Sequence, residues 1–382
     1  MTSARHVEAP GTEWRVESVV TEEGLLALRA GWERLLDAGA GVTPFDAWWM
    51  TYRAWRLEKG SPVPFVLVAH DANGSVAGVL PLGVRRLRRG VLTWRVLDTI
   101  APRRLDFVDV IAHPENRSIA LATMLQWLAR HWREWDELRL SPVREDSTIA
   151  SELRRLAPRS LEARLDPVSD NFAVTIPPGA RGWEDVCDGE TRRGLRRTAR
   201  RLEGSGFVIG RVSAGYPLER ALDALVGLHE RRRGEFGQLS RIASADRNEL
   251  ALLVGDAVAR GGDLWVMERD GAAVAVQLTL RLGCHVSHYR LAYDSAFRSA
   301  SPGIGLLIAA IDDAVKSGAT DYDFGFGAEE YKRRWANLRR VVFRLRISSK
   351  HPGRFPRRLW SLAMRSRPRL RRAKAKRAVP RQ

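Results

Sequence analysis

One order of predicted elements occurs twice in this chain, and this repetition restricts its fold more than any other feature. Residues 64–84 predict two strands joined by an Asp-Ala-Asn-Gly turn, and residues 263–282 predict two strands joined by Asp270-Gly271. The two hairpins are about 199 residues apart. Each precedes a further strand or two, one apolar helix and one short strand. The sequence therefore predicts an internal duplication, with a period too long for a solenoid.

A chain of 382 residues is long for one domain and natural for two. We expect a first module over residues 12–165, a linker near Asp166-Pro167, a second module over residues 170–348 and a tail over residues 349–382. The expected fold class is α/β, in which each module holds a mixed, mostly antiparallel sheet flanked by helices.

The first module contains patterns with more than one interpretation. Residues 45–57 predict a helix dense in tryptophan and tyrosine, either packed in a core or forming the aromatic wall of a substrate cleft. Residues 107–111 predict a strand, and residues 153–165 predict a helix and turn. A helix over residues 117–132 follows His113-Pro114 without any glycine. We therefore expect this module to be a scaffold or an acceptor wall without a donor site.

The stretch from Arg298 to Trp335 carries the most specific local pattern, RSASPGIGLLIAAIDDAVKSGATDYDFGFGAEEYKRRW. Ser301-Pro302 ends a strand, and Gly303 and Gly305 leave the backbone bare where a helix begins. Helix N-termini present unpaired N–H groups and partial positive charge, which suit pyrophosphate oxygens. The short SPGIG motif taken alone also fits an ordinary loop.

The whole stretch resembles a known family. A strand, SPG, an amphipathic helix, G-x-x-x-Y-D-F-x-x-G and E-x-Y-K are similar to the C-terminal half of bacterial GNAT-type acetyltransferases. The resemblance is strongest to the CelD-like branch, which is related to the Fem (FemAB-like) peptidoglycan aminoacyltransferases, and it covers roughly residues 172–347. It implies tandem GNAT-like modules. It also implies coenzyme A pyrophosphate binding at the loop-to-helix turn, by Arg298, Ser301, Gly303, Ile304 and Gly305, although Ser301 stands where the family's turn has its first glycine.

Acyl transfer to an amine needs a base or water relay, an oxyanion donor and an acid for the leaving group. Candidate relay carboxylates are Glu330, Asp323 and Asp294. Tyr331 can donate a proton and Lys332 can stabilise negative charge; the pair resembles an aromatic-Lys pair of the Fem enzymes. Structural alternatives are that Asp323 caps the glycine turn and that Tyr331 packs against the sheet.

An arginine-rich helix over residues 182–203 is the other candidate binding element. Its arginines cover one broad side, and Leu195, Ala199 and Leu202 form the opposite stripe. This pattern fits either a solvated amphipathic helix or a clamp for phosphates, because guanidinium groups bind phosphate bidentately. The candidate substrate-binding residues are Arg196, Arg200, Tyr293, Gly325 and Gly327.

Charge, cysteines and histidines narrow the function classes. The net charge of +18 belongs to the C-terminal end: residues 331–382 hold 20 Lys and Arg and no acid, whereas residues 1–330 hold 43 Lys and Arg against 45 acids. This argues against a whole-body nucleic-acid binder with DNA specificity and predicts a basic appendage. The tail suits binding to an anionic membrane surface, to tRNA or to another polyanion; alternatively, it is a solvated disordered segment.

Cys187 and Cys284 predict neither a disulfide framework nor a metal site. In CHVSHY, His285 and His288 fall on opposite strand faces, so they form no metal pair.

The sequence thus predicts an N-acyltransferase that moves an acyl group from acetyl-CoA to an amine of a small-molecule, cell-envelope or polysaccharide-related acceptor, without a metal. One alternative is a Fem-like transferase that uses aminoacyl-tRNA. Another is a non-catalytic GNAT-like scaffold that docks on a membrane or polyanion. The expected location is cytoplasmic, or peripheral at the inner face of the membrane, because no apolar run of about twenty residues and no signal-peptide pattern occurs.

Overall fold

The computed structural model describes residues 8–9, 12–39, 43–58, 60, 62–89, 92–235 and 247–351. The tail beyond His351 lies outside these residues, so the predictions made for it are not tested by the fold. Within the described ranges, none of the helices combines the length and the apolar run that a membrane crossing requires.

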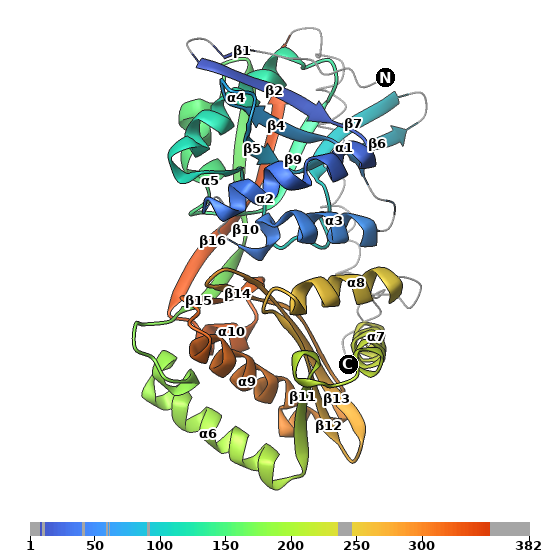
Figure 1. Cartoon of the computed structure of the whole chain (residues 1–382), viewed down its shortest axis with the longest axis vertical. Helices are drawn as coiled ribbons and strands as arrows, with labels where there is room; N and C mark the ends of the chain where they lie inside the picture. Colours follow the sequence, from blue (N-terminus) through green and yellow to red (C-terminus); the bar gives the residue numbers. More distant parts are fainter. Residues whose placement is uncertain are drawn as a thin grey trace, which may run out of the picture.

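The first half of the chain forms the upper part of the molecule (Figure 1). Among the described residues, its strands belong to two sheets: five strands form a sheet of their own, and four belong to a larger sheet that continues into the second half. The elements are β1 (Glu8–Ala9), β2 (Thr12–Val19), α1 (Glu22–Ala27), α2 (Arg29–Asp37), η1 (Pro44–Asp46), α3 (Trp48–Leu57), β3 (Val63–Pro64), β4 (Val66–His70), β5 (Val76–Leu80), β6 (Leu82–Arg89), β7 (Leu92–Thr99), β8 (Ile111–Ala112), η2 (Pro114–Asn116), α4 (Arg117–Arg130) and β9 (Glu137–Arg144).

The second half forms the lower part, with α6 and α9 on one side of the sheet and α7 and α8 on the other (Figure 1). The next element along the chain, α5 (Thr148–Leu156), still packs against α4 in the upper part. The elements of the second half are β10 (Leu161–Thr175), η3 (Trp183–Val186), α6 (Gly189–Gly204), β11 (Phe207–Arg211), η4 (Val212–Ala214), α7 (Leu218–Gly234), α8 (Arg247–Val258), β12 (Asp263–Arg269), β13 (Ala272–Leu282), β14 (His285–Tyr293), η6 (Ser295–Ala300), α9 (Pro302–Lys316), β15 (Asp321–Phe326), α10 (Glu330–Trp335) and β16 (Leu338–Ser349).

The sheet topology confirms the duplicated order. The first half places its hairpin β4–β5 beside β2, and the second places β12–β13 beside β11. Both halves then pair two strands in parallel across one apolar helix: β7 with β9 across α4, and β14 with β15 across α9. The remaining neighbours are antiparallel. The predicted α/β class with mixed, mostly antiparallel sheets is therefore confirmed.

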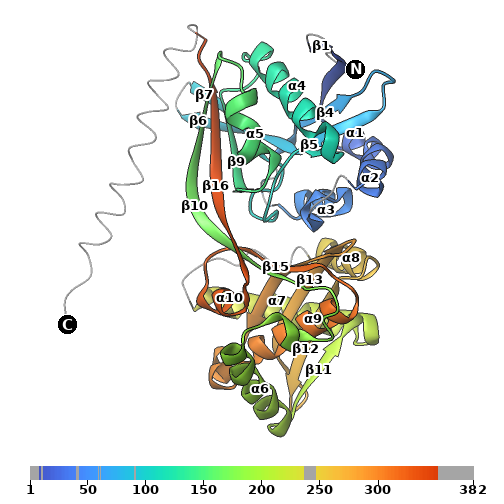
Figure 2. The same ribbon diagram turned by 90° about the vertical axis from the view of Figure 1, so that its left-hand side faces the viewer.

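Two long strands, β10 and β16, join the halves into one eleven-stranded sheet (Figure 2). β10 pairs with β15 in the second half, whereas β16, the last described strand, pairs with β9 in the first. The linker expected near Asp166-Pro167 is wrong, because both residues lie inside β10. Pro167 is tolerated there because the register shifts between Pro167 and Ser169, and an irregularity can accommodate the missing N–H. The division into residues 12–165 and 170–348 stays a prediction.

Two other local predictions in the first half were wrong. The helix expected over residues 153–165 is α5, which begins at Thr148, where Ser147 caps it, and ends at Leu156. The strand expected over residues 107–111 is reduced to the two residues of β8. Most of residues 100–110 is irregular backbone instead, and this freedom lets Asp106 reach the second half.

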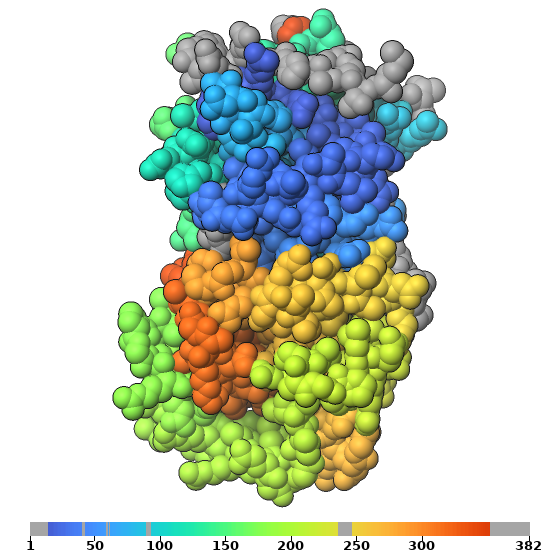
Figure 3. Space-filling model, viewed as in Figure 1, coloured from blue at the N-terminus to red at the C-terminus, as the bar shows by residue number. Residues whose placement is uncertain are grey.

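The aromatic helix α3 belongs to the core and not to a cleft wall. Trp48 and Trp49 are buried in a hydrophobic cluster that includes Leu253 of α8. α3 also lies against α8 across the junction of the halves, where Arg53 Nε contacts Asp256 Oδ2 at 2.8 Å. In the space-filling view this junction is closed over the visible face (Figure 3). One continuous core therefore crosses the junction and fixes the halves together.

Candidate functional site

The strands β14 and β15 separate in the middle of the second half. Their parallel pairing covers only His285 to Ser287 against Asp321 to Asp323. Beyond this point β14 continues to Tyr293 beside β13, and β15 continues beside β10. The residues that follow the last pair, His288 and Phe324, therefore lie where the sheet opens.

Asp323 sits at this opening and is 4% exposed. Its Oδ1 accepts hydrogen bonds from Asn171 Nδ2 and from the N–H of Gly325, both at 2.7 Å. Its Oδ2 lies 3.5 Å from Nη1 of Arg144 and 3.7 Å from Nη1 of Arg340. Burial raises the pKa of Asp323, and the two guanidinium groups oppose the rise. Asp323 thus caps the glycine turn, as the structural alternative required, and also joins the halves.

Lys332 is a buried cation beside the same turn. It is 3% exposed, and its Nζ donates to the carbonyl of Phe326 at 3.0 Å and contacts Glu329 Oε2 at 2.8 Å. Tyr331 packs edge-on against Phe324 with ring centroids 6.5 Å apart, and burial raises its pKa. Lys332 therefore lies beside the turn, as predicted, and Tyr331 packs next to it.

Glu330 was expected in this gathering, and that expectation is wrong. Its side chain is 79% exposed and its Oε1 accepts from Arg334 Nη2 at 2.7 Å on the outer face of α10. The preceding residue, Glu329, is the N-cap of α10 and takes the position beside Lys332. Asp294 also lies apart: it caps η6 through the N–H of Ala296 and contacts Arg231.

Three residues at the opening were missed by sequence reasoning: Asp106, His288 and Arg290. Asp106 comes from the first half. A Cβ built on Gly325 would lie 2.5 Å from Asp106 Oδ2 and 3.3 Å from the carbonyl oxygen of His288. Gly325 also has a φ of 71°, which favours glycine. Glycine is thus required by the backbone and by the carboxylate that covers it. No sequence signal links position 106 with position 325.

His288 is a neutral, buried imidazole. It is 6% exposed, and burial together with the charges of Lys332 and Arg290 lowers its pKa to about 3. Its Nδ1 has no hydrogen-bond partner among the described residues. Arg290 Nη1 lies 3.8 Å from Asp106 Oδ1, and burial raises the pKa of Asp106 against the influence of Arg290 and Lys332. Strand alternation puts His285 and His288 on opposite faces of β14, and His288 is on the face that lines the opening.

The predicted phosphate turn forms the start of α9, but its glycines have a different local role. Ser301 adopts a left-handed φ of 62°. A Cβ on Gly303 would meet Leu291 and Tyr293, and one on Gly305 would meet Leu202 and Met267. Both glycines therefore allow α9 to pack closely on the sheet and on α6. At this turn Ile304 is half-buried and Arg298 is exposed. Contacts of the turn with pyrophosphate stay a prediction.

The arginine-rich helix α6 lies beside the start of α9. Leu195 and Leu202 are buried, which confirms the amphipathic stripe. Arg201 Nη2 donates to the carbonyl of Ala300 at 3.2 Å. Arg196 is engaged by Glu184, with Nε to Oε1 at 2.7 Å, whereas Arg200 is exposed.

The other expected substrate-binding residues occupy separate places. The ring of Tyr293 lies under the guanidinium of Arg232 at 4.9 Å. Gly327 has a φ of 122°, with the carboxylate of Glu329 where a Cβ would stand. Across the described residues, no three His, Cys, Asp or Glu side chains are grouped to hold a metal ion.

Comparisons with known proteins agree with this architecture. Residues 189–333 match the family model described as acetyltransferase (GNAT) domain. Three solved structures share the fold. FemX is 13% identical, with a TM-score of 0.57, and the match covers 79% of this chain and 92% of that one. The C-terminal DUF2156 domain of a putative lysylphosphatidylglycerol synthetase from Agrobacterium fabrum is 9% identical, with a TM-score of 0.56 and coverages of 87% and 95%, and L-PGS from Bacillus licheniformis is 13% identical, with a TM-score of 0.53 and coverages of 84% and 92%. No curated protein sequence matches the chain.

Proposed function

We propose that the chain is an acyltransferase that moves an acyl group, most simply acetyl from acetyl-CoA, to an amine, because residues 189–333 match the family model of a GNAT acetyltransferase domain. The acceptor we expect is a small molecule or a cell-envelope or polysaccharide component. The observation that carries the proposal is the opening between β14 and β15, where the buried cation Lys332 lies with the carboxylate of Asp106 and the neutral imidazole of His288.

This arrangement supplies the groups that amine acylation needs. The amine nitrogen attacks the carbonyl carbon of the thioester, and the carbon–sulfur bond breaks. Lys332 would stabilise the negative charge that develops on the carbonyl oxygen. Asp106, whose pKa burial raises, would accept the proton that leaves the nitrogen. Tyr331 would donate a proton to the departing thiolate. Asp323 would position the turn and not react, since its Oδ1 accepts from Asn171 and Gly325 and its Oδ2 faces two arginines.

The donor would lie along the start of α9. Arg298 and Ile304 are accessible there, and α6 brings Arg200 and Arg201 to the same side through its contact with Ala300. Guanidinium groups and the helix N-terminus together favour pyrophosphate oxygens. This placement leaves the acyl group to enter the opening between the two strands.

A Fem-like transfer from aminoacyl-tRNA is the second candidate. It is favoured by the exposed basic face of α6, on which Arg193, Arg197 and Arg200 are all exposed. A polyanion longer than coenzyme A would use such a face. We also propose that the basic tail is attracted to tRNA or to an anionic membrane. The expected location is then cytoplasmic, or peripheral at the membrane.

Donor binding separates the candidates. The full chain is titrated with acetyl-CoA, with coenzyme A and with aminoacyl-tRNA, and thermal stabilisation and acyl transfer to a panel of amines are measured. Stabilisation by coenzyme A and transfer from acetyl-CoA are expected. Transfer from aminoacyl-tRNA alone would establish the second candidate, and the absence of transfer from both donors to every amine would contradict acyl transfer by this site.

A further inference from the structure

Among the described residues, three of the four sheet edges are formed by very short strands. The five-stranded sheet ends in β1 and β8, and the eleven-stranded sheet ends in β3 and β11. β1, β8 and β3 have two residues each, and β3 includes a proline. Short edge strands and proline are means by which natural proteins prevent edge-to-edge association. β11 differs from the other three edges, because it has five residues.

The edge formed by β11 is open to pairing with another strand. β11 contains no proline or lysine, and its pairing with β12 runs from Phe207 to Arg211 without a bulge. Along the described part of the chain, β12 is its one strand neighbour. The carbonyl of Arg211 accepts from the N–H of Tyr216 at 3.0 Å, and no other backbone group of β11 bonds outside the β11–β12 ladder among the described residues. The outward N–H and C=O groups can therefore template a further strand.

The exposed side chains in the middle of β11 are apolar. Val208 is 64% exposed and Ile209 is 40% exposed, although both lie in a regular strand. Successive residues of a strand point to opposite faces, so the edge presents one large apolar side chain on each face of the sheet. Apolar side chains that lie together on a surface mark sites of association.

A groove lies on the same edge, beginning at the residue after Val208. It has a volume of about 560 Å³, and its lining is Ile209, Gly210, Arg211, Ala214, Gly215, Tyr216, Pro217, Arg220 and Trp265. The ring of Tyr216 covers Gly210, since a Cβ built on this glycine would lie 2.4 Å from the ring. Because about 10–15 Å³ of such space holds one water molecule, the groove has room for an aliphatic side chain.

The exposed valine and the groove make this edge complementary to a second copy of itself. In an antiparallel pair of β11 strands with a two-fold axis at Ile209, residue 208 of one copy lies opposite residue 210 of the other. Val208 of each copy then enters the groove beside Gly210 of the other and packs against Tyr216. The two Ile209 side chains meet at the axis. A two-fold axis uses the same surface twice, so each contact forms in duplicate.

Charges beside the edge do not oppose this pairing. Arg211 contacts Asp313, and Arg220 Nη2 lies 2.7 Å from Glu268 Oε1. These guanidinium groups are thus compensated within one copy. The opening between β14 and β15 is separated from β11 by β12 and β13, so pairing at this edge leaves the candidate site of each copy open.

We propose that the chain forms a two-fold symmetric dimer by antiparallel pairing of β11 with β11 of a second copy. The pairing joins the two eleven-stranded sheets at their edges. A five-residue strand buries less area than a standard interface, so we expect a reversible dimer with a dissociation constant of about 1–100 μM. The dimer does not depend on the proposed acyl transfer.

Sedimentation velocity of the full chain tests the dimer at concentrations from about 1 to about 200 μM. The weight-average sedimentation coefficient should rise from the monomer value towards the dimer value. Raising the salt from about 0.1 to about 0.5 M should not weaken this association, because its contacts are backbone hydrogen bonds and apolar side chains, whereas association through the basic tail is screened. A monomer at every concentration, or association that is lost in salt, would overturn the proposal.

Two substitutions of Ile209 test the position of the axis. Ile209→Lys and Ile209→Glu each bring like charges together at the axis, so each should weaken self-association about tenfold or more. An equimolar mixture of the two variants should form dimers again, because opposite charges then meet. Leu252→Lys is the matched control, since it adds a charge at an exposed leucine of α8 and should leave the dimer unchanged.

A third variant keeps the test informative if a charged variant does not fold. Val208→Thr preserves the branched shape and the strand preference, yet it places a hydroxyl group in the groove of the other copy and should weaken the dimer measurably. Thermal denaturation confirms that each variant is folded. Dimerisation that persists in the folded variants, or a mixture of the Ile209 variants that stays monomeric, would refute pairing about Ile209.

Discussion

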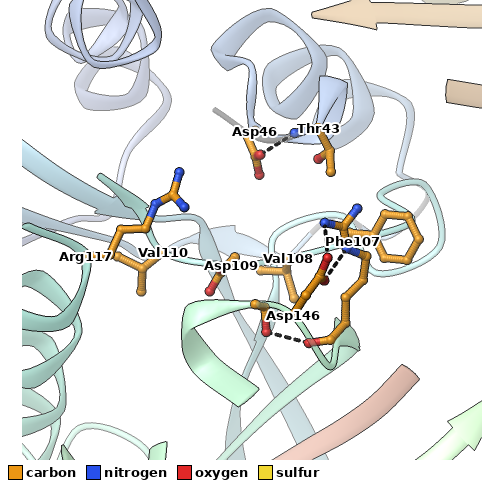
Figure 4. Close-up of a pocket in the computed structure, with 10 residues that line it drawn as sticks. Thr43, Asp46, Phe107, Val108, Asp109, Val110, Arg117 and Asp146 are labelled. Carbon is orange, nitrogen blue, oxygen red and sulfur yellow. Dashed lines mark hydrogen bonds and ion pairs between the residues drawn. The ribbon is translucent and has the colours of Figure 1, made fainter. Parts of the chain in front are cut away.

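Arg144 of β9 and Asp323 of β15 form a buried ion pair between the two halves, with Nη1 3.5 Å from Oδ2. The residues are 179 positions apart in the sequence. Arg144 also lines a pocket of the first half (Figure 4), while Asp323 caps the glycine turn of the second. One guanidinium group therefore connects this pocket with the glycine turn of the candidate site.

Removing this guanidinium should destabilise the whole chain. Arg144→Leu would leave Asp323 and Asp146 with less compensation in a buried environment, and breaking a buried pair costs about 3–5 kcal/mol. Arg155→Leu is the matched control, because its exposed pair with Glu152 contributes at most about 1 kcal/mol. Chemical denaturation of the full chain measures both. A loss in Arg144→Leu as small as in the control would contradict a structural role for the pair.

Gly325→Ala should cost more stability than Gly74→Ala. The two glycines have similar positive φ values, 71° and 76°, so the backbone strain of about 1–2 kcal/mol is common to both. A Cβ at Gly74 meets nothing within 4 Å, whereas one at Gly325 meets Asp106 Oδ2 at 2.5 Å. Thermal denaturation of the two variants gives the difference, and Asp106→Gly should reduce the cost of Gly325→Ala. Equal melting temperatures for the two alanine variants would show that Asp106 yields freely.

Lys332→Met should lower turnover much more than donor affinity. If Lys332 stabilises charge that grows in the transition state, the loss in kcat should be about 100-fold to 1,000-fold, with a small change in the Kd of acetyl-CoA. Arg334→Met is the control, since Arg334 lies on the exposed face of α10. Steady-state kinetics and donor titration are compared. A parallel loss of donor affinity would instead make Lys332 a donor ligand.

Gly303→Val should reduce stability as well as activity. The added side chain would point at Leu291 and Tyr293 on the sheet, and overpacking of this kind costs about 1–3 kcal/mol. An obstruction of phosphate alone would weaken donor binding and leave the melting temperature unchanged. Measuring the melting temperature and the acetyl-CoA Kd of this variant distinguishes the two roles.

Acid should destabilise the chain partly through His288. Its pKa is lowered to about 3 in the folded state, so between pH 6.5 and pH 3 the unfolded chain binds a proton that the folded chain does not. The contribution is therefore fully favourable above about pH 6.5 and is lost as the pH falls, to about 5 kcal/mol at most. The free energy of unfolding of wild type and His288→Gln is measured from pH 4 to pH 8. A difference between the two that does not change with pH would contradict a neutral buried imidazole.

The sequence by itself determined the duplicated order, the amphipathic face of α6 and the place of Lys332 beside a glycine turn. These features depend on periodicity and turn chemistry within short segments, and side chains at i, i+3 and i+4 report them directly. The tertiary structure decided the rest. The exchange of β10 and β16 and the contacts Asp106–Gly325 and Arg144–Asp323 join positions that no local pattern connects. Glu330 lies outside the site for a similar reason. α10 packs with Lys332 buried, so the side chain of Glu330 faces solvent.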